Sequence, residues 1–320
     1  MAAASNCEVQ QSGARVYISL TTIPSRASLL SLTIESLMKQ DYANVGAIVV
    51  TVPTVNVRGL PFKEEADFSW LTALTAAHPD AAPVVIQRPA FDYGPIMKYI
   101  GASMYLGQHP DLQAWVFVCD DDQQYATDRV SVLMSQVPCV RGTLSLKHFV
   151  AVPTNYVFHV FMKSFFAPMG VYGMVMSYAG IMAIADETQA QFSSGSQGLC
   201  KSCIMNDDVS VGVFLWKKGF RVVSDRVGAN HARVFATKKL AFGADALADT
   251  YASNFHKFND MMRCSCTLEP YRCWGALVFV LIILLILVSI ALLIYLVARP
   301  LRVSAATTSA NADGGATQRL

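Results

Sequence analysis

One segment near the end of the chain constrains the architecture most strongly, because it contains no charged residue over 24 positions. This segment, Gly275–Ala298, reads GALVFVLIILLILVSIALLIYLVA. A helix of that length, at about 1.5 Å per residue, is longer than the roughly 30 Å hydrocarbon core of a bilayer. Trp274 and Tyr295 lie where interfacial aromatic residues occur, and Arg272 and Arg299 flank the segment. The sequence therefore predicts a transmembrane helix here in preference to a buried soluble helix.

The rest of the chain is organised around this predicted anchor. The N-terminal MAAASNCEVQQSGA has neither a basic nor an apolar region, so no secretory signal is predicted. We expect a flexible N-terminus over 1–14, a folded domain over 15–260, a juxtamembrane segment over 261–274 and a disordered tail over 299–320. The simplest topology is a single-pass membrane protein with a C-terminal anchor and residues 1–270 in the cytosol.

A second charge-free stretch, Ser164–Ala185, must be weighed as a further membrane span. It contains Pro168 and several glycines, which would leave a lipid-exposed helix weak and kinked. We therefore predict buried strands and loop of the folded domain here, with a membrane helix as the alternative.

Composition narrows the classes of partner. The formal net charge of +2 predicts no nucleic-acid partner. The eight cysteines are scattered and indicate no disulfide framework. The predicted contacts are therefore with a membrane and with small molecules.

The folded domain alternates apolar strands with helices. Strands are predicted at Val16–Thr21, Ala47–Val52, Pro83–Gln87, Ala114–Cys119 and Arg221–Ser224. Helices are predicted at Pro95–Leu106, Asp128–Gln136, Asp208–Lys218 and around Leu30, Ile34, Leu37 and Met38. This rhythm predicts an α/β fold with an open, Rossmann-like, mostly parallel sheet flanked by helices. Ligands of such sheets lie beyond the carboxyl ends of the strands.

Three adjacent aspartates, Asp120, Asp121 and Asp122, directly follow the apolar strand AWVFVC. Adjacent carboxylates repel one another and are costly at a buried strand end unless a cation neutralises them. Hard oxygen ligands suit Mg²⁺ or Mn²⁺, which share such sites with substrate phosphates. The position after a buried strand favours a metal site over a solvated acidic turn.

Two further aspartates, Asp207 and Asp208, open an amphipathic helix. Helix capping explains part of this pattern, because Asn and Asp are preferred at helix N-termini. Two aspartates exceed what capping needs, and one of them beside an acceptor hydroxyl would serve as a general base. The sequence favours the functional interpretation, which is compatible with capping.

A third group of polar residues, Arg88, Asp92, Tyr93 and Lys98, lies between a predicted strand and the next helix. A helix N-terminus with nearby Arg and Lys is suited to an anion or a nucleotide. His231 follows the last predicted strand, and a lone histidine is more often structural than a ligand.

Together, the segments TTIPSR, RPAFDYGPIMK, VFVCDDD and NDDVSVGVFLWKKGFRV, followed by His231, resemble GT-A glycosyltransferases over roughly residues 15–235. The resemblance implies a DxD motif, with Asp120 on the ribose and metal, Asp122 on the metal and His231 completing its coordination. It implies that Asp208 is the catalytic base, although the Asn-Asp-Asp pattern leaves Asp207 as the alternative. The expected nucleotide-binding residues are Thr21, Thr22, Pro24, Arg26, Arg88, Asp92, Tyr93, Lys98, Asp120 and Asp121.

The expected function is therefore metal-dependent transfer of a sugar from a UDP- or GDP-sugar donor to an acceptor hydroxyl, with inversion. The sequence leaves the acceptor open, with a glycan, a protein and a lipid-linked molecule as the candidates. Three alternatives stay open: a nucleotidyltransferase on the same fold, an inactive nucleotide-sugar-binding membrane adaptor, and a structural membrane protein with solvated acidic turns.

Overall fold

The computed structural model describes residues 2–54, 62, 68–151, 173–193, 207–225, 232–234, 281, 283–292 and 295. The chain divides into two compact units, Met1–Leu268 and Glu269–Leu320, which are considered separately. The first unit contains the whole of the predicted folded domain. His231 and Asn206 lie outside the described residues.

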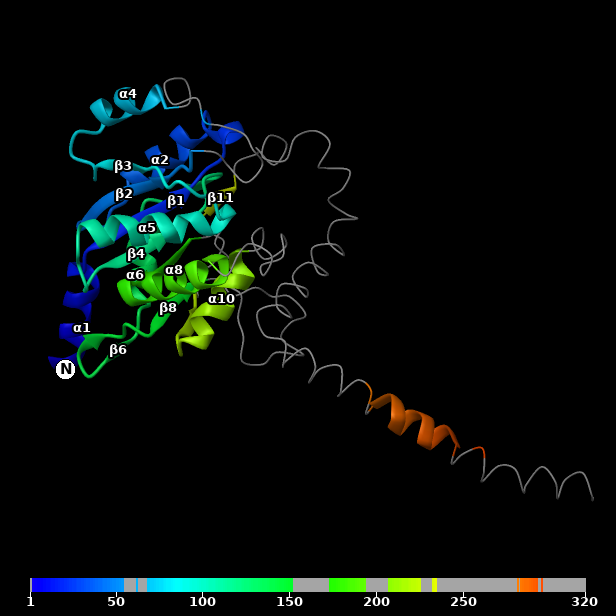
Figure 1. Ribbon diagram of the computed structural model, residues 1–320. Helices are drawn as coiled ribbons and strands as arrows, with labels where there is room; N and C mark the ends of the chain where they lie inside the picture. The colour runs from blue at the N-terminus through cyan, green and yellow to red at the C-terminus, as the bar shows by residue number, and fades with distance from the viewer. Residues whose placement is uncertain are drawn as a thin grey trace, which may run out of the picture. The chain divides into compact units, whose positions relative to one another are not determined.

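The first unit is built on a seven-stranded sheet of order β10-β8-β9-β4-β1-β2-β3 (Figure 1). Its strands are β1 (Val16–Thr21), β2 (Val45–Thr51), β3 (Val84–Gln87), β4 (Trp115–Val118), β8 (His148–Ala151), β9 (Met174–Ser177) and β10 (Arg221–Ser224). Only β9 within this sheet runs antiparallel to its neighbours, β4 and β8. The carboxyl ends of the six other strands therefore meet at one edge, and the predicted mostly parallel α/β sheet is confirmed.

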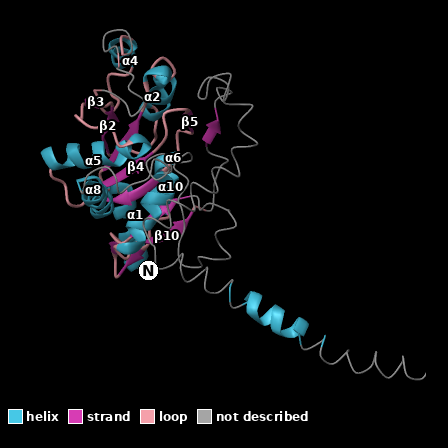
Figure 2. Cartoon of the chain, turned by 45° about the vertical axis from the view of Figure 1, so that its right-hand side comes forward, coloured by secondary structure: helices cyan, strands magenta, loops and turns pink. Residues whose placement is uncertain are grey.

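Helices pack on both faces of this sheet (Figures 1 and 2). One face contacts α2 (Leu30–Met38), α4 (Trp70–Ala77) and α6 (Arg129–Ser135), and the other contacts α5 (Met97–Gln108), α8 (Tyr178–Ser193) and α10 (Asp207–Lys217). Successive side chains of a strand point to opposite faces of the sheet, so β1 contributes to two separate cores. Ile18 and Leu20 face the first set of helices, and Tyr17 faces the second set. Burial on both faces explains why β1, β2 and β4 are almost wholly apolar.

Short elements complete the described part of this unit. They are the 3-10 turns η1 (Pro24–Arg26) and η2 (Gly94–Ile96), and the two-stranded pairs β5 (Gln123–Tyr125) with β11 (Ala232–Val234) and β6 (Cys139–Val140) with β7 (Thr143–Leu144). Of these, η1, η2 and β5 follow the carboxyl ends of β1, β3 and β4 along the chain.

The N-terminus differs from the predicted flexible segment. Residues Ala2–Gly13 form helix α1, which contacts α6 and β7. Gln11 Nε2 donates to the carbonyl of Val137 at 2.9 Å, and Tyr42 donates its hydroxyl to the carbonyl of Gln11 at 2.7 Å. Cys7 forms a disulfide with Cys139, with the two Cα atoms 6.0 Å apart. The cysteine spacing did not indicate this bond, because partners 132 positions apart form no local motif.

The interpretation of Ser164–Ala185 as strands and loop is partly wrong. Residues 174–177 form the buried strand β9, but the chain then enters helix α8 rather than a loop. The inward face of this helix is apolar, with Ile181 and Ile184 fully buried. Residues 164–172 lie outside the described part of the chain.

The second unit contains the predicted transmembrane segment. Its described residues, 281, 283–292 and 295, are helical with exposed apolar side chains. Among the residues that the structure describes, no helix has the length and apolarity needed to span a bilayer. The rest of the predicted span, the juxtamembrane segment 261–274 and the tail 299–320 lie outside the described residues. The membrane anchor therefore stays a prediction.

Candidate functional site

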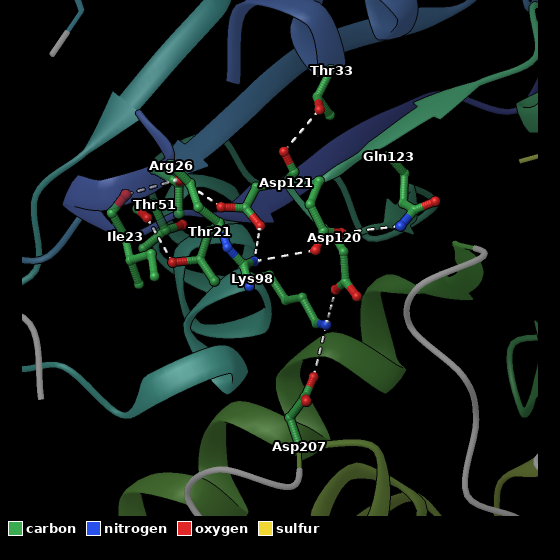
Figure 3. Close-up of polar contacts among 12 residues, drawn as sticks. Thr21, Ile23, Arg26, Thr33, Thr51, Lys98, Asp120, Asp121, Gln123 and Asp207 are labelled. Carbon is green, nitrogen blue, oxygen red and sulfur yellow. Dashed lines mark hydrogen bonds and ion pairs between the residues drawn. The ribbon is translucent and has the colours of Figure 1, made fainter. Parts of the chain in front are cut away.

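The strand order of the sheet locates the candidate site. From β1 the chain proceeds to β2 and β3 on one side, and it then crosses to β4 on the other side. The order reverses between β1 and β4, and open α/β sheets bind ligands beyond the carboxyl ends of strands at such a point. Thr21 ends β1 and Asp120 lies just beyond β4, so two of the predicted motifs meet there (Figure 3).

The middle aspartate of the triplet is turned into the protein. Asp121 is 4% exposed, and its carboxylate accepts hydrogen bonds from Thr22 at 2.5 Å and from Arg26 at 2.7 Å. Its backbone carbonyl accepts the hydroxyl of Thr33 at 2.8 Å. Burial raises the pKa of the Asp121 carboxyl above its usual value, although Arg26 and Thr22 act against that shift. Asp121 thus ties the end of β4 to the turn after β1 and to α2.

The first aspartate of the triplet is joined to the second acidic motif. Lys98 Nζ lies 2.7 Å from Asp120 Oδ1 and 2.7 Å from Asp207 Oδ2 (Figure 3). Burial by itself lowers the pKa of the Lys98 ammonium, but Asp120 and Asp207 together raise it well above its usual value. Lys98 therefore brings two motifs that are far apart in sequence into one cluster.

The third aspartate has a more open position. The side chain of Asp122 is 23% exposed, and its Oδ2 lies 3.5 Å from Arg26 Nη1. Its Oδ1 accepts a hydrogen bond from Gln123 Nε2 at 3.1 Å. The hydroxyl of Tyr125 accepts from the backbone N–H of Asp120 at 3.0 Å and supports the turn that carries the triplet. The sequence analysis did not single out Gln123 or Tyr125, and the one signal that could have found them is their position directly after the triplet.

The acidic side chains at this edge of the sheet are candidate ligands for a divalent cation. Within the described part of the chain, no group of three or more His, Cys, Asp or Glu side chains is placed to hold a metal ion. Asp120 and Asp122 nevertheless offer partly exposed carboxylates at one strand end, with side chains 30% and 23% exposed. Mg²⁺ in particular is commonly held by one or two carboxylates together with substrate phosphates and water. The residues present fit a cation of that kind.

His231 cannot be compared with this donor set, because it lies outside the described residues. The next residue in sequence, Ala232, belongs to β11 and pairs with Tyr125 of β5. That pairing places the start of β11 against the strand that directly follows the aspartate triplet.

The other predicted site residues make contacts within the protein. The guanidinium of Arg88 lies 5.3 Å from the ring centre of Phe68, and Thr21 donates its hydroxyl to the carbonyl of Thr51 at 2.8 Å. The carboxylate of Asp92 accepts the backbone N–H of Gly94 at 2.7 Å. The remaining predicted residues lie on elements at or near this edge: Pro24 in η1, Tyr93 before η2, and Asp208 as the second residue of α10. The predicted roles, general base for Asp208 and nucleotide binding for the others, stay predictions.

Comparison with known proteins adds little to this site. No protein-family model matches the chain, and no curated protein matches its sequence. Among solved structures, a glycosyltransferase, GlyE from Streptococcus pneumoniae TIGR4, is similar with a TM-score of 0.39 and 12% identity, over 77% of this chain and 51% of that one. The chain spans about half the length of that structure. Similarity at this level does not establish a function, so the assignment depends on the residues of the site.

Proposed function

We propose that this chain is a metal-dependent GT-A glycosyltransferase that moves a sugar from a nucleoside-diphosphate sugar to an acceptor hydroxyl. The observation that carries the proposal is the Lys98 bridge, since it joins Asp120 and Asp207 within 2.7 Å contacts at the switch point of the sheet. Solvated acidic turns, as in a purely structural membrane protein, would not bury Asp121 and Lys98 to 4% and 2% exposure. The proposal agrees with the sequence resemblance over roughly residues 15–235.

The charge of the cluster supports a requirement for a metal ion. Its five aspartates, Asp120, Asp121, Asp122, Asp207 and Asp208, outnumber the two basic side chains, Arg26 and Lys98, by three formal charges. A diphosphate would be repelled by that excess. Asp120 and Asp122 would hold a divalent cation, which would supply positive charge to offset that of the diphosphate and of the leaving group.

The chain's own residues would carry the remaining chemistry. Asp208 removes the proton from the acceptor hydroxyl, and the acceptor oxygen forms a bond to the anomeric carbon of the donor sugar. The bond between that carbon and the diphosphate oxygen breaks, and its electron pair leaves with the nucleoside diphosphate. The N-termini of α5 and α10, which both begin at this edge of the sheet, favour the negative charge of the diphosphate. Attack from the face opposite the leaving group gives inversion.

Two other functions use the same site and are separated by their products. A nucleotidyltransferase would release pyrophosphate while it makes an activated sugar. A membrane adaptor would bind the nucleotide sugar without turnover. We place glycosyl transfer first because the two carboxylates at the start of α10 offer a general base. Neither an adaptor that only binds the nucleotide sugar nor a nucleotidyltransferase requires a base there.

The test uses the full-length chain in detergent with a panel of UDP- and GDP-sugars, in Mn²⁺ and in excess chelator. We expect Mn²⁺-dependent release of UDP or GDP from one donor, through hydrolysis or transfer. Asp122→Asn should lower that rate by about two to three orders of magnitude, because a charged contact to the transition state is lost. The matched control is Asp80→Asn, an exposed aspartate in the turn that precedes β3, which should leave the rate unchanged.

The contrary results are equally specific. Metal-dependent nucleotide binding without turnover would favour the adaptor, and pyrophosphate release would favour the nucleotidyltransferase. Full activity of the Asp122→Asn variant would refute the assignment of Asp120 and Asp122 as a metal-binding DxD motif.

A further inference from the structure

The ammonium of Lys98 has a role that the sequence did not predict. Sequence patterns indicated that Lys98 contacts the nucleotide or the diphosphate. In the structure its Nζ is engaged by Asp120 and Asp207, and its side chain is 3% exposed (Figure 3). The ammonium donates a hydrogen bond to Asp120 Oδ1 and forms an ion pair with Asp207 Oδ2. Lys98 is therefore placed to hold two protein groups together rather than to reach out to a ligand.

The backbone of Lys98 is also held in place. Ser19, a fully buried residue of β1, donates its hydroxyl to the carbonyl of Lys98 at 2.6 Å. Lys98 is the second residue of α5, and Gly101 of the same helix packs closely against Thr51 of β2. The bridge therefore starts from a rigid helix that is attached to two central strands.

The far end of the bridge sets the orientation of α10. Asp207 is the first residue of that helix, and Asp208 is the second. Successive residues of an α-helix point about 100° apart around the axis. A fixed position for the carboxylate of Asp207 therefore also restricts the direction of the Asp208 side chain.

We propose that Lys98 is a positioning residue, which holds the start of α10 against Asp120 so that Asp208 acts as the base while Asp207 is committed to the bridge. This inference rests on the proposed glycosyl transfer. It resolves the choice between Asp207 and Asp208 that the sequence left open.

The first experiment is a double-mutant cycle on kcat and donor KM in the full-length chain, with Lys98→Met, Asp207→Asn and the double variant. Each single change should lower kcat by about 10-fold to 100-fold with a smaller change in donor KM, because ground-state binding is largely retained. The double variant should be within about threefold of the slower single variant, since both changes break the same bridge. Effects that multiply, or a Lys98→Met effect confined to donor KM, would mean that Lys98 binds the diphosphate directly.

A second comparison does not depend on the folding of Lys98→Met, which leaves the carboxylates of Asp120 and Asp207 without their cation. Asp208→Asn should lower kcat by about 10²-fold to 10⁴-fold, the usual contribution of a general base, and by more than Asp207→Asn. Binding of UDP or GDP with Mn²⁺ should be preserved in both variants. A larger loss in Asp207→Asn than in Asp208→Asn would reverse the two roles and overturn the inference.

These outcomes separate the inference from the function on which it rests. An inactive wild-type chain in the donor panel would refute the proposed glycosyl transfer. An active wild type with multiplicative effects in the cycle would refute only the positioning role of Lys98.

Discussion

At the scale of single residues, the protein supplies part of the positive charge that its aspartate triplet needs. Arg26 and Lys98 each lie 2.7 Å from one carboxylate of the triplet, so Asp121 and Asp120 each have a close basic partner. Asp122 is 3.5 Å from Arg26 and keeps a side chain that is 23% exposed. This division sets the two aspartates that have a close basic partner, Asp120 and Asp121, apart from the more open Asp122, and the proposed binding of a metal ion by Asp120 and Asp122 stays a prediction.

A second buried pair offers a stability prediction at the same scale. Arg129 at the start of α6 and Asp225 after β10 are joined at 2.8 Å, and both side chains are fully buried. Asp225→Ala should lower the free energy of unfolding by about 3–5 kcal/mol, because a buried guanidinium loses its counter-charge. Denaturant unfolding of the variant and the wild type would measure the difference.

The control replaces both partners of that pair. The double variant Arg129→Met with Asp225→Leu removes both charges and fills the space of both side chains with apolar groups of similar size. The free energy of unfolding of this double variant should therefore be closer to that of the wild type than that of Asp225→Ala. A single variant that unfolds at the wild-type midpoint would show that the pair contributes nothing.

At the scale of elements, helix α5 decides where Lys98 lies. Its approach to β2 requires a glycine at position 101, because a Cβ there would collide with the side chain of Thr51. Gly107 belongs to the same helix but has open space around the corresponding position. The two glycines of α5 thus differ in what a methyl group would meet.

Gly101→Ala should therefore destabilise the protein by about 1–3 kcal/mol, the usual cost of overpacking. It should also lower kcat, because a displaced α5 moves Lys98 away from its two carboxylates. Gly107→Ala is the matched control and should raise stability by up to about 1 kcal/mol with unchanged kcat. Thermal unfolding and kcat of both variants test the difference, and equal behaviour would contradict the packing argument.

At the scale of the whole molecule, the disulfide bears on the compartment of the first unit. Disulfides persist in oxidising compartments and are rare in the cytosol. The Cys7–Cys139 bond therefore favours the non-cytosolic side of a membrane, whereas the sequence favoured the cytosol for residues 1–270. The location of the unit stays a prediction, and the two expectations differ in a measurable way.

We expect the protein isolated from cells, with thiols blocked before lysis, to contain a peptide pair linked through Cys7 and Cys139. Cys7→Ser should lower the stability of the unit by about 2–5 kcal/mol, the usual effect of removing a native disulfide. Mass spectrometry without reduction identifies the linked peptides, and protease protection of membrane vesicles reports the side. Free thiols at both positions together with an accessible domain would support the cytosolic topology.

Local sequence patterns were sufficient to predict many of the strands and helices. β-branched apolar runs predicted β1 and β10 with the bounds that the structure has, and helical spacing of Leu30, Ile34 and Leu37 predicted α2. Helix α1 and the Cys7–Cys139 bond were missed, since α1 has little amphipathic pattern and its partners are distant in sequence. The helix after β9 was missed because small residues in Tyr178–Ser193 resemble a loop.

The sequence by itself determined which residues carry charge at the ends of apolar strands and at the starts of helices, because that depends only on neighbours along the chain. It therefore identified Asp120, Asp122, Asp207 and Lys98 as candidates. Only the tertiary structure decided their partners: Lys98 bridges two carboxylates, and Asp121 is turned inward. The reason is physical, since a charge at a buried site is stabilised by the groups that folding brings within a few ångströms, and those groups come from the turn after β1, from α5 and from α10.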